Sequence, residues 1–230
     1  MMTEPINDAA LRYSDSSLAE KLPEYEKHYY IEPASRRTSA LYRAAKRTMD
    51  IITSFLGLVV LAVPTLILAL IVALDSPGAP IYKQERLGRN GKPFTIYKIR
   101  TMRLDAEKNG PRWAKEDDDR CTKIGRTLRH YHLDELPQLW NILKGDMSFV
   151  GPRPERACFY DEFEQYVHGF RNRLAVRPGL TGLAQVNGGY ELPPEEKIVY
   201  DMKYINELSL KMDLACVFKT VHVVFIRKER

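Results

Sequence analysis

Cysteine is scarce in this sequence of 230 residues, and the few thiols form no recognisable pattern. They are Cys121, Cys158 and Cys216, an odd number of widely separated residues without metal-ligand spacing. Such thiols are typical of a reducing cytoplasm, so we expect packed or surface side chains rather than a disulfide framework or a cysteine-bound metal. Internal repeats and low-complexity tracts are also lacking, which argues against a repeat architecture.

Charge is missing from one long segment. No charged residue occurs between Asp50 and Asp75, and 16 of the 24 residues 51–74 are Leu, Ile, Val or Phe. Each of these side chains contributes roughly 0.3 to 0.6 kcal/mol toward insertion, so the segment is predicted to enter a membrane. A straight helix of this length would reach about 36 Å against about 30 Å of hydrocarbon, so a spanning helix is the simplest interpretation.

Two features argue against a straight span. The 20 residues before the segment contain five basic residues and the 20 after it contain four, so the positive-inside rule favours both flanks on the cytoplasmic side. Pro64 lies near the middle of the segment, where it should kink or break the helix near Val63. A re-entrant helix that dips into one leaflet is therefore favoured over a spanning helix, with a buried helix of a soluble protein as a third alternative.

The rest of the chain is strongly polar and needs its own fold, because all 65 charged residues lie outside this segment. Residues 1–40 are polar and irregular, which predicts a flexible N-terminal extension. Residues 41–76 hold the membrane helix, and residues 77–230 suffice for one cytoplasmic domain with a core. The net charge of +5 and the pI near 9.0 suit anionic lipid, a phosphorylated substrate or nucleic acid equally well.

Residue patterns predict a mixed α/β domain. Asn90-Gly91 suits the positive φ angles of a tight turn, so residues 81–87 and 94–102 are expected to form a β-hairpin. The charged stretch 103–120 is expected to be a solvated loop, since a metal site at its three consecutive aspartates would need partners elsewhere. Helical spacing of apolar residues predicts helices over residues 124–131, 133–143, 159–170 and 214–225. The last helix could rest on the bilayer, but packing on the core is favoured.

The acidic pair Asp134-Glu135 stands where the second of these helices should begin. Unpaired N–H groups and the helix dipole would keep a carboxylate there ionised and would admit a phosphate. Arg129 precedes the pair and Arg153 follows it; such cations suit phosphoryl chemistry, and a neighbouring carboxylate can hold Mg²⁺. From spacing alone, an N-cap aspartate beside a surface glutamate is the simpler interpretation. The glycine-rich basic stretch 177–189 could approach a phosphate or form a plain turn.

Three ordered motifs resemble the bacterial sugar transferase family, the monotopic phosphoglycosyl transferases that act on polyprenyl phosphate. The motifs are KPFTIYKIRTM at residues 92–102, LDELPQLWNILKGDMSFVGPRPE at residues 133–155 and VRPGLTGLAQVNG at residues 176–188. The resemblance covers about residues 41–226. It implies a helix that returns to the cytoplasmic face at a Ser-Pro break. This sequence has Val63-Pro64 at that place, which keeps the proline and lacks the serine.

The resemblance also implies a reaction. A sugar phosphate would pass from a UDP-sugar to polyprenyl phosphate with release of UMP and with Mg²⁺ as cofactor, as the first membrane step of surface-glycan assembly. Asp134 would be the nucleophile that forms a covalent phosphosugar-aspartyl intermediate, and Glu135 would bind Mg²⁺. The cationic motif positions that would hold phosphates or the nucleotide are Lys98, Arg129, Arg153 and Arg177, of which Lys98 is the weaker match.

We therefore expect an α/β monotopic enzyme of the bacterial inner membrane, with a Pro-broken re-entrant helix and a small domain of amphipathic helices and a β-hairpin on the cytoplasmic face. Its partners would be a UDP-sugar, polyprenyl phosphate and the bilayer, without nucleic acid, and a homo-oligomer stays open. One alternative is a membrane-bound metal-dependent phosphodiesterase or nuclease with the same carboxylates. Another is a membrane-anchored nucleic-acid-binding or scaffold module, whose binding would be salt-sensitive and indifferent to a change at Asp134. The sequence leaves the transferred sugar open.

Overall fold

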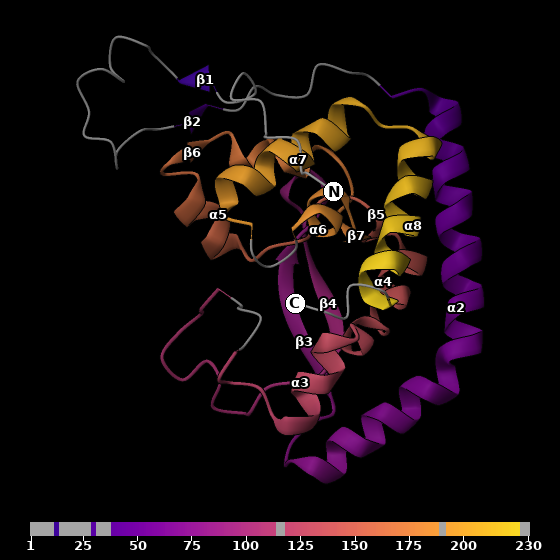
Figure 1. The fold of residues 1–230 in the computed structure, drawn as a ribbon, viewed down its shortest axis with the longest axis vertical. Helices are drawn as coiled ribbons and strands as arrows, with labels where there is room; N and C mark the ends of the chain where they lie inside the picture. The colour runs from indigo at the N-terminus through magenta and orange to yellow at the C-terminus, as the bar shows by residue number, and fades with distance from the viewer. Residues whose placement is uncertain (1–11, 14–28, 31–37, 114–117, 189–191, 226–230) are drawn as a thin grey trace.

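One long helix runs along the side of the molecule (Figure 1). The computed structural model describes residues 12–13, 29–30, 38–113, 118–188 and 192–225. Helix α2 (Ala40–Asp75) has 36 residues and contains Pro64. It continues across this proline, and its axis changes direction along its length in Figure 1, as helices with an internal proline commonly do. The expected break near Val63 is not seen as an interruption of the helix, and re-entry into a membrane stays a prediction.

The apolar side chains of α2 are mostly exposed. Within the described residues, α2 is the one helix long and apolar enough to cross a membrane, and 11% of its most apolar window is buried. A core helix of a soluble protein would hide such side chains, so the third alternative for this segment loses its support. The exposed large side chains include Ile51, Ile52, Phe55, Leu56, Val59, Val60, Val63, Leu66, Ile67 and Leu70.

The remaining elements form the predicted α/β domain beside α2, with short sheets and several helices. Strand β3 (Ile81–Leu87) pairs antiparallel with β4 (Pro93–Ile99), and β5 (Ser148–Val150) pairs parallel with β7 (Gly179–Thr181). A third sheet has the order β1 (Arg12–Tyr13), β2 (Tyr29–Tyr30) and β6 (Val167–His168). The helices are α3 (Lys123–His130), α4 (Gln138–Lys144), α5 (Ala157–Phe163), α6 (Leu183–Asn187), α7 (Pro194–Asn206) and α8 (Leu210–Phe225), with 3₁₀ turns η3 (Arg89–Gly91), η4 (Leu133–Glu135) and η5 (Phe170–Ala175).

The β-hairpin prediction is confirmed. Asn90 and Gly91 have φ angles of 58° and 72°, in the left-handed region that Asn and Gly tolerate best. They belong to the three-residue turn η3 rather than to a two-residue turn. Ile96 and Ile99 of β4 are buried in two separate apolar clusters, and side chains of α2 belong to both.

The predicted helices are confirmed in part. Helix α3 agrees with the prediction, whereas the helix expected over residues 133–143 is divided into the turn η4 and the helix α4. The helix expected over residues 159–170 is wrong beyond α5. There the Glu164 carboxylate accepts hydrogen bonds from the backbone N–H groups of Gly169 and Arg171, and Gly169 has φ 92°, so the chain turns away. Helix α7 was not predicted.

Helix α8 packs on the core with one side. Asp213 and Cys216 are buried, which confirms the favoured prediction of core packing. The opposite side remains apolar and exposed at Leu210, Leu214 and Phe218.

The charged stretch 103–120 contains no helix or strand among its described residues. Asp118 is buried and accepts hydrogen bonds of 2.7 and 2.6 Å from Arg120, so the prediction of a solvated run fails at this residue. Asp119 is exposed and pairs with Arg112 at 2.7 Å, while Asp117 lies outside the described residues. No group of three metal-ligating side chains occurs within the described parts of the chain.

Most of the predicted N-terminal extension lies outside the described residues. Its two described strands, β1 and β2, pair with each other, and β2 also pairs with β6 of the domain. The flexibility of residues 1–40 stays a prediction.

Both ends of α2 are fastened to the same domain. Near its start, the Tyr42 hydroxyl and the Lys46 ammonium lie 2.9 Å from the buried carboxylate of Asp213 in α8. Past its end, the Arg100 guanidinium donates to the carbonyl of Ser76 at 2.7 Å and also to that of Pro77. Between these points Leu58 and Leu61 pack on a cluster with Leu139 and Ile142 of α4. The helix therefore lies along the domain instead of leaving it.

Candidate active site

The acidic pair is buried in a turn, not exposed at a helix N-terminus. Asp134 and Glu135 belong to η4, and α4 begins only at Gln138 with Pro137 as its N-cap residue. The residue before η4, His132, has φ 54°, a left-handed backbone conformation that is uncommon outside glycine. Asp134 is 6% exposed and Glu135 5%. The expectation of an N-cap aspartate beside a surface glutamate is therefore wrong.

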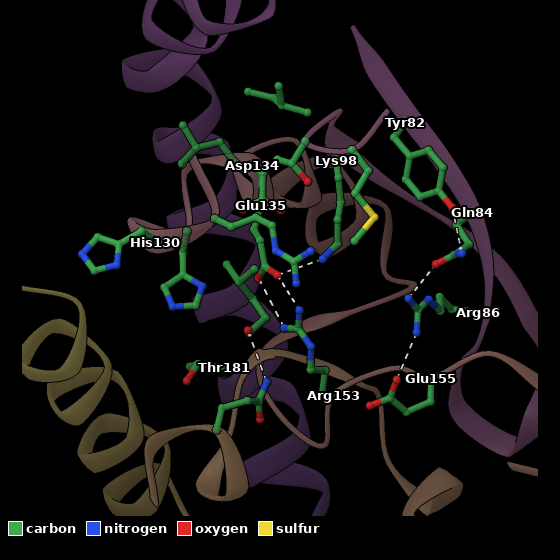
Figure 2. A pocket seen from close by; sticks show the side chains of 18 of the residues that line it. Tyr82, Gln84, Arg86, Lys98, His130, Asp134, Glu135, Arg153, Glu155 and Thr181 are labelled. Atoms are coloured by element: carbon green, nitrogen blue, oxygen red, sulfur yellow. Dashed lines mark hydrogen bonds and ion pairs between the residues drawn. The ribbon is translucent and has the colours of Figure 1, made fainter. Parts of the chain in front are cut away.

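Glu135 is held by two cations from distant parts of the chain (Figure 2). Its Oε1 atom lies 2.9 Å from Lys98 Nζ of β4 and 2.6 Å from an Arg153 nitrogen of the segment after β5. Burial alone would raise the pKa of Glu135, but the positive charges of Arg153 and Lys98 outweigh it and hold the pKa well below its ordinary value. Glu135 is thus ionised at neutral pH.

Asp134 has the opposite shift. Burial raises the pKa of its carboxyl from 3.8 to about 6, Lys98 acts against this rise, and the charge of Glu135 adds to it. Burial is a larger effect than the nearby cations, yet a carboxyl with this pKa is still mostly ionised at pH 7. A pair of neighbouring carboxyls with separated pKa values is typical of sites where the two groups have different chemical roles.

One cavity of about 1000 Å³ brings most of the predicted residues together. Lys98, Arg129, Asp134, Glu135 and Arg153 all line it. Its size is that of a pocket for a substrate larger than a simple sugar. The cavity suits a ligand with several phosphate charges, because its wall has further cationic side chains, namely Arg86, Arg100, Arg103, Arg112, Arg120, Arg156, Arg173 and Lys197.

A hydrogen-bonded row of side chains lines the cavity and was not predicted. Gln84 donates to the Tyr82 hydroxyl at 2.8 Å and accepts from Arg86 at 2.6 Å, and Arg86 donates to Glu155 at 3.0 Å. Three of these residues alternate along β3, so they share one face of the strand. That alternation is the one sequence signal that could have found them.

Lys197 is a second missed residue of the wall. Its ammonium lies 4.4 Å from the centre of the Trp113 ring and 3.9 Å from Glu155. It belongs to α7, and the failure to predict that helix explains why the residue was missed.

Arg177 does not line this cavity. Its Nε atom donates to the carbonyl of Gly145 at 2.9 Å, and Arg47 donates to the carbonyls of Ile142 and Leu143 at 2.7 Å each. The two arginines thus satisfy the last carbonyls of α4, an ordinary way to end a helix. A substrate-binding role for Arg177 finds no support in this position.

The glycine-rich stretch after Arg177 serves the packing of the β5–β7 sheet. A Cβ atom on Gly179 would lie 2.1 Å from the backbone nitrogen of Gly151. Only glycine at position 179 therefore allows these two backbone segments to lie so close together. The phosphate-cradle interpretation of this stretch is therefore not needed.

Comparison with known proteins identifies the family. Residues 41–227 match the model of the family described as bacterial sugar transferase. The chain belongs to this family. The resemblance seen in the motifs is thereby confirmed over almost the same residues. Together with the apolar helix α2, family membership indicates that this bacterial sugar transferase associates with a membrane.

Relatives with assigned names share about two fifths of their aligned residues with this bacterial sugar transferase. A UDP-N-acetylgalactosamine-undecaprenyl-phosphate N-acetylgalactosaminephosphotransferase of Aeromonas hydrophila is 39% identical over 189 residues, covering 81% of this chain and 45% of the relative. A UDP-glucose:undecaprenyl-phosphate glucose-1-phosphate transferase of Escherichia coli strain K12 is 38% identical over 195 residues, covering 83% of this chain and 42% of the relative. A protein of the same name from Caulobacter vibrioides is 41% identical over 181 residues, covering 76% of this chain and 68% of the relative. The chain thus spans less than half the length of the first two relatives.

The donor set of the site fits the predicted Mg²⁺. This ion prefers one or two carboxylates together with substrate phosphates and waters. Asp134 and Glu135 provide two carboxylates adjacent in sequence, and among the described residues Glu135 Oε2 has only a long contact of 3.5 Å with Arg153. That oxygen would be the available ligand, since Oε1 is already held by Lys98 and Arg153.

Proposed function

We propose that this bacterial sugar transferase moves a sugar-1-phosphate from a UDP-sugar to polyprenyl phosphate, with Asp134 as the nucleophile. The observation that carries the proposal is the buried Asp134-Glu135 pair, with separated pKa values, in a cavity rich in cations. The names of the relatives add an undecaprenyl phosphate acceptor and UDP-sugar donors.

In the first step, an oxygen of the ionised Asp134 carboxylate attacks the β-phosphorus of the UDP-sugar. A new P–O bond forms, the bond from this phosphorus to the bridging oxygen breaks, and UMP leaves with that oxygen. The protein then carries a phosphosugar on Asp134. A raised pKa makes this carboxylate more basic, and hence a better nucleophile, once it has lost its proton.

In the second step, an oxygen of polyprenyl phosphate attacks the phosphorus of this intermediate. The bond to Asp134 breaks, the carboxylate is restored, and polyprenyl diphosphosugar is the product. Splitting one transfer into two displacements lets a water-soluble donor and a lipid acceptor react at the same carboxylate in turn.

The cations of the cavity would stabilise the charge that shifts among phosphate oxygens. Arg153 and Lys98 hold Glu135 in place and stand beside Asp134, and Arg129 lines the same wall. Such preorganised charges act strongly in a site sheltered from water. Mg²⁺, held by Glu135, would neutralise the negative charge of the donor's diphosphate.

We also propose that α2 enters the cytoplasmic leaflet of the inner membrane and returns to the same side. The support is that Lys46 near its start and Ser76 after its end both contact one polar domain. This placement would leave the catalytic cavity on the cytoplasmic face, where nucleotide sugars are made.

The decisive experiment compares Asp134→Asn with the parent enzyme in the full chain. Purified protein is incubated with radiolabelled UDP-glucose, UDP-galactose, UDP-N-acetylglucosamine or UDP-N-acetylgalactosamine, first without and then with undecaprenyl phosphate. The parent should acquire label without acceptor and pass it to lipid when acceptor is added, whereas Asp134→Asn should do neither. Asp161→Asn, at an exposed residue of α5 outside the cavity, is the matched control and should behave as the parent. Label retained by Asp134→Asn would exclude Asp134 as the nucleophile.

The same assay separates the alternative functions. A phosphodiesterase would release sugar phosphate or nucleotide without undecaprenyl phosphate and would form no labelled lipid. A nucleic-acid-binding or scaffold module would show neither reaction, and Asp134→Asn would leave its salt-sensitive binding intact.

A further inference from the structure

The cavity wall changes character from one side of the acidic pair to the other. Figure 2 shows Tyr82, Gln84, Arg86 and Glu155 on one side of Glu135, and Thr181 with the yellow helix α8 on the opposite side. Besides the polar side chains of Thr181, Gln185 and Thr220, the side toward α8 has apolar residues of several elements. These are Leu61 of α2, Leu139 of α4, Leu180 of β7, Ala184 of α6, and Val217 and Val221 of α8. We call this set the apolar arm of the cavity.

The polar groups of a nucleotide sugar would find no hydrogen-bond partner on the apolar arm. Its base, ribose, phosphates and sugar carry polar groups throughout, and apolar side chains offer none of them a hydrogen bond. The polar side of the cavity, with the hydrogen-bonded row on β3 and several cations, suits such a ligand. The apolar arm instead suits a ligand whose chain is hydrocarbon and whose charged end reaches the acidic pair.

The apolar arm is continuous with apolar surface outside the cavity. Val221 lines the cavity and is also 52% exposed, so it stands at the rim. On the same helix, the outward side chains of Leu214 and Phe218 are exposed. The helix is tied to the cavity wall by the hydrogen bond of 2.6 Å between the hydroxyls of Thr220 and Thr181. On the other flank, Leu61 belongs to the apolar segment of α2.

We propose that the apolar arm holds the isoprene units of the acceptor that lie next to its phosphate, and that α8 forms one wall of this acceptor subsite. The inference rests on the proposed function, because it takes the acceptor to be a polyprenyl phosphate. The phosphate lies at the acidic pair, the first isoprene units lie against Leu139, Val217 and Val221, and the rest of the chain leaves past the rim toward the bilayer. The acceptor thus enters from the side of α2 and α8, and the nucleotide sugar from the opposite side.

The test introduces a carboxylate at the rim of the arm. In Val221→Asp the ionised group would have to lose water against the hydrocarbon of the acceptor, so kcat/KM for undecaprenyl phosphate should fall about tenfold or more. Ala215→Asp is the matched control, because Ala215 is exposed on the same helix and does not line the cavity. It carries the same change of charge and should keep the kcat/KM of the parent. Ala215→Asp should acquire label from the UDP-sugar without acceptor at the rate of the parent, and the labelling rate of Val221→Asp is measured beside it, so that a loss confined to the acceptor step can be recognised.

The labelling without acceptor and the kcat/KM for undecaprenyl phosphate test the function and the acceptor subsite separately. Normal labelling with an unchanged kcat/KM for the acceptor in Val221→Asp would overturn the acceptor subsite and leave the two-step reaction intact. An equal loss in both variants would also overturn it, because the effect would then not depend on the cavity. Absence of labelling in the parent would instead overturn the proposed function.

A second measurement needs no substitution. An isoprenyl phosphate with a photoreactive diazirine on its second isoprene unit is irradiated with the parent enzyme, and the cross-linked peptides are identified by mass spectrometry. Cross-links on α8 around Val217 and Val221 are expected. Cross-links confined to the outward side of α2 would overturn the inference.

Discussion

At the scale of single residues, the separation of the two carboxyl pKa values makes the first step sensitive to pH. Asp134 must be ionised to attack, and burial raises its pKa to about 6. The rate of labelling by the UDP-sugar should therefore rise about tenfold per pH unit below this pKa and level off above it.

Two substitutions should move this acid limb in opposite directions. The charge of Glu135 raises the pKa of Asp134, so Glu135→Gln should shift the limb to lower pH. The charge of Lys98 lowers that pKa, so Lys98→Met should shift it to higher pH. Single-turnover labelling measured from pH 4.5 to 8 gives the acid limb of each variant. Shifts in the same direction would mean that another group controls the rate.

The same residue scale gives a prediction for Mg²⁺. If Glu135 holds the ion, Glu135→Gln should move the Mg²⁺ titration of the labelling rate to roughly tenfold higher concentration or more, because a neutral amide is a weaker ligand than a carboxylate. Glu155→Gln is the contrasting variant: this carboxylate also lines the cavity and is held by Arg86, and its loss should leave the midpoint of the titration in place. An unchanged midpoint in Glu135→Gln would assign the metal to other ligands.

At the scale of elements, the ends of α2 depend on a few polar contacts. The buried Arg100 donates to the carbonyls of Val72, Ser76 and Pro77. The Val72 carbonyl also accepts from the Ser76 N–H group, but Arg100→Met would take the donor from the Ser76 and Pro77 carbonyls and cost about 2 to 4 kcal/mol, which corresponds to a fall in Tm of roughly 5 to 15 °C in detergent. Arg103→Met, at a mostly exposed side chain three residues later, should stay within about 2 °C of the parent. Similar Tm values for the two variants would show that α2 is held without Arg100.

The elements that sequence patterns predicted are those whose pattern is local. The hairpin follows from Asn90-Gly91, and α3 and α8 follow from apolar spacing. Helix α7 was not predicted, because two of its inward positions are charged. Lys197 is buried beside Trp113, and Asp201 pairs with the buried Arg173 at 2.6 Å. Such positions break the apolar period that marks an amphipathic helix in a sequence.

In the candidate site, too, the residues of local motifs were predicted and the features that depend on distant contacts were not. The motifs predicted the acidic pair, Lys98, Arg129 and Arg153, and these residues do meet in one cavity. Burial of the pair could not be predicted, because it results from segments far apart in the chain that close over η4. Arg177 satisfied the motif equally well, yet its guanidinium lies at the end of α4, so a match of residue type alone did not decide its place.

At the scale of the whole molecule, the length of α2 constrains its relation to a bilayer. The 30 residues from Lys46 to Ser76 would extend about 45 Å as a straight helix, which exceeds the hydrocarbon thickness of about 30 Å. A span would therefore place its two ends in water on opposite sides. Here Lys46 contacts Asp213 and Ser76 contacts Arg100, both within one polar domain, and a polar domain cannot extend through hydrocarbon.

The last prediction concerns this topology. Single cysteines replace Thr38, before α2, and Lys83, after it, in a background where the exposed Cys158 is serine. Both should react with a membrane-impermeant maleimide only when the cytoplasmic face is opened, since a re-entrant helix keeps both flanks on that side. Labelling after permeabilisation with detergent shows that each thiol is reactive and serves as the control. Reaction of one substitute from the periplasmic side and the other from the cytoplasmic side would establish a spanning helix, and the contacts of Lys46 and Ser76 could then not both exist in the membrane.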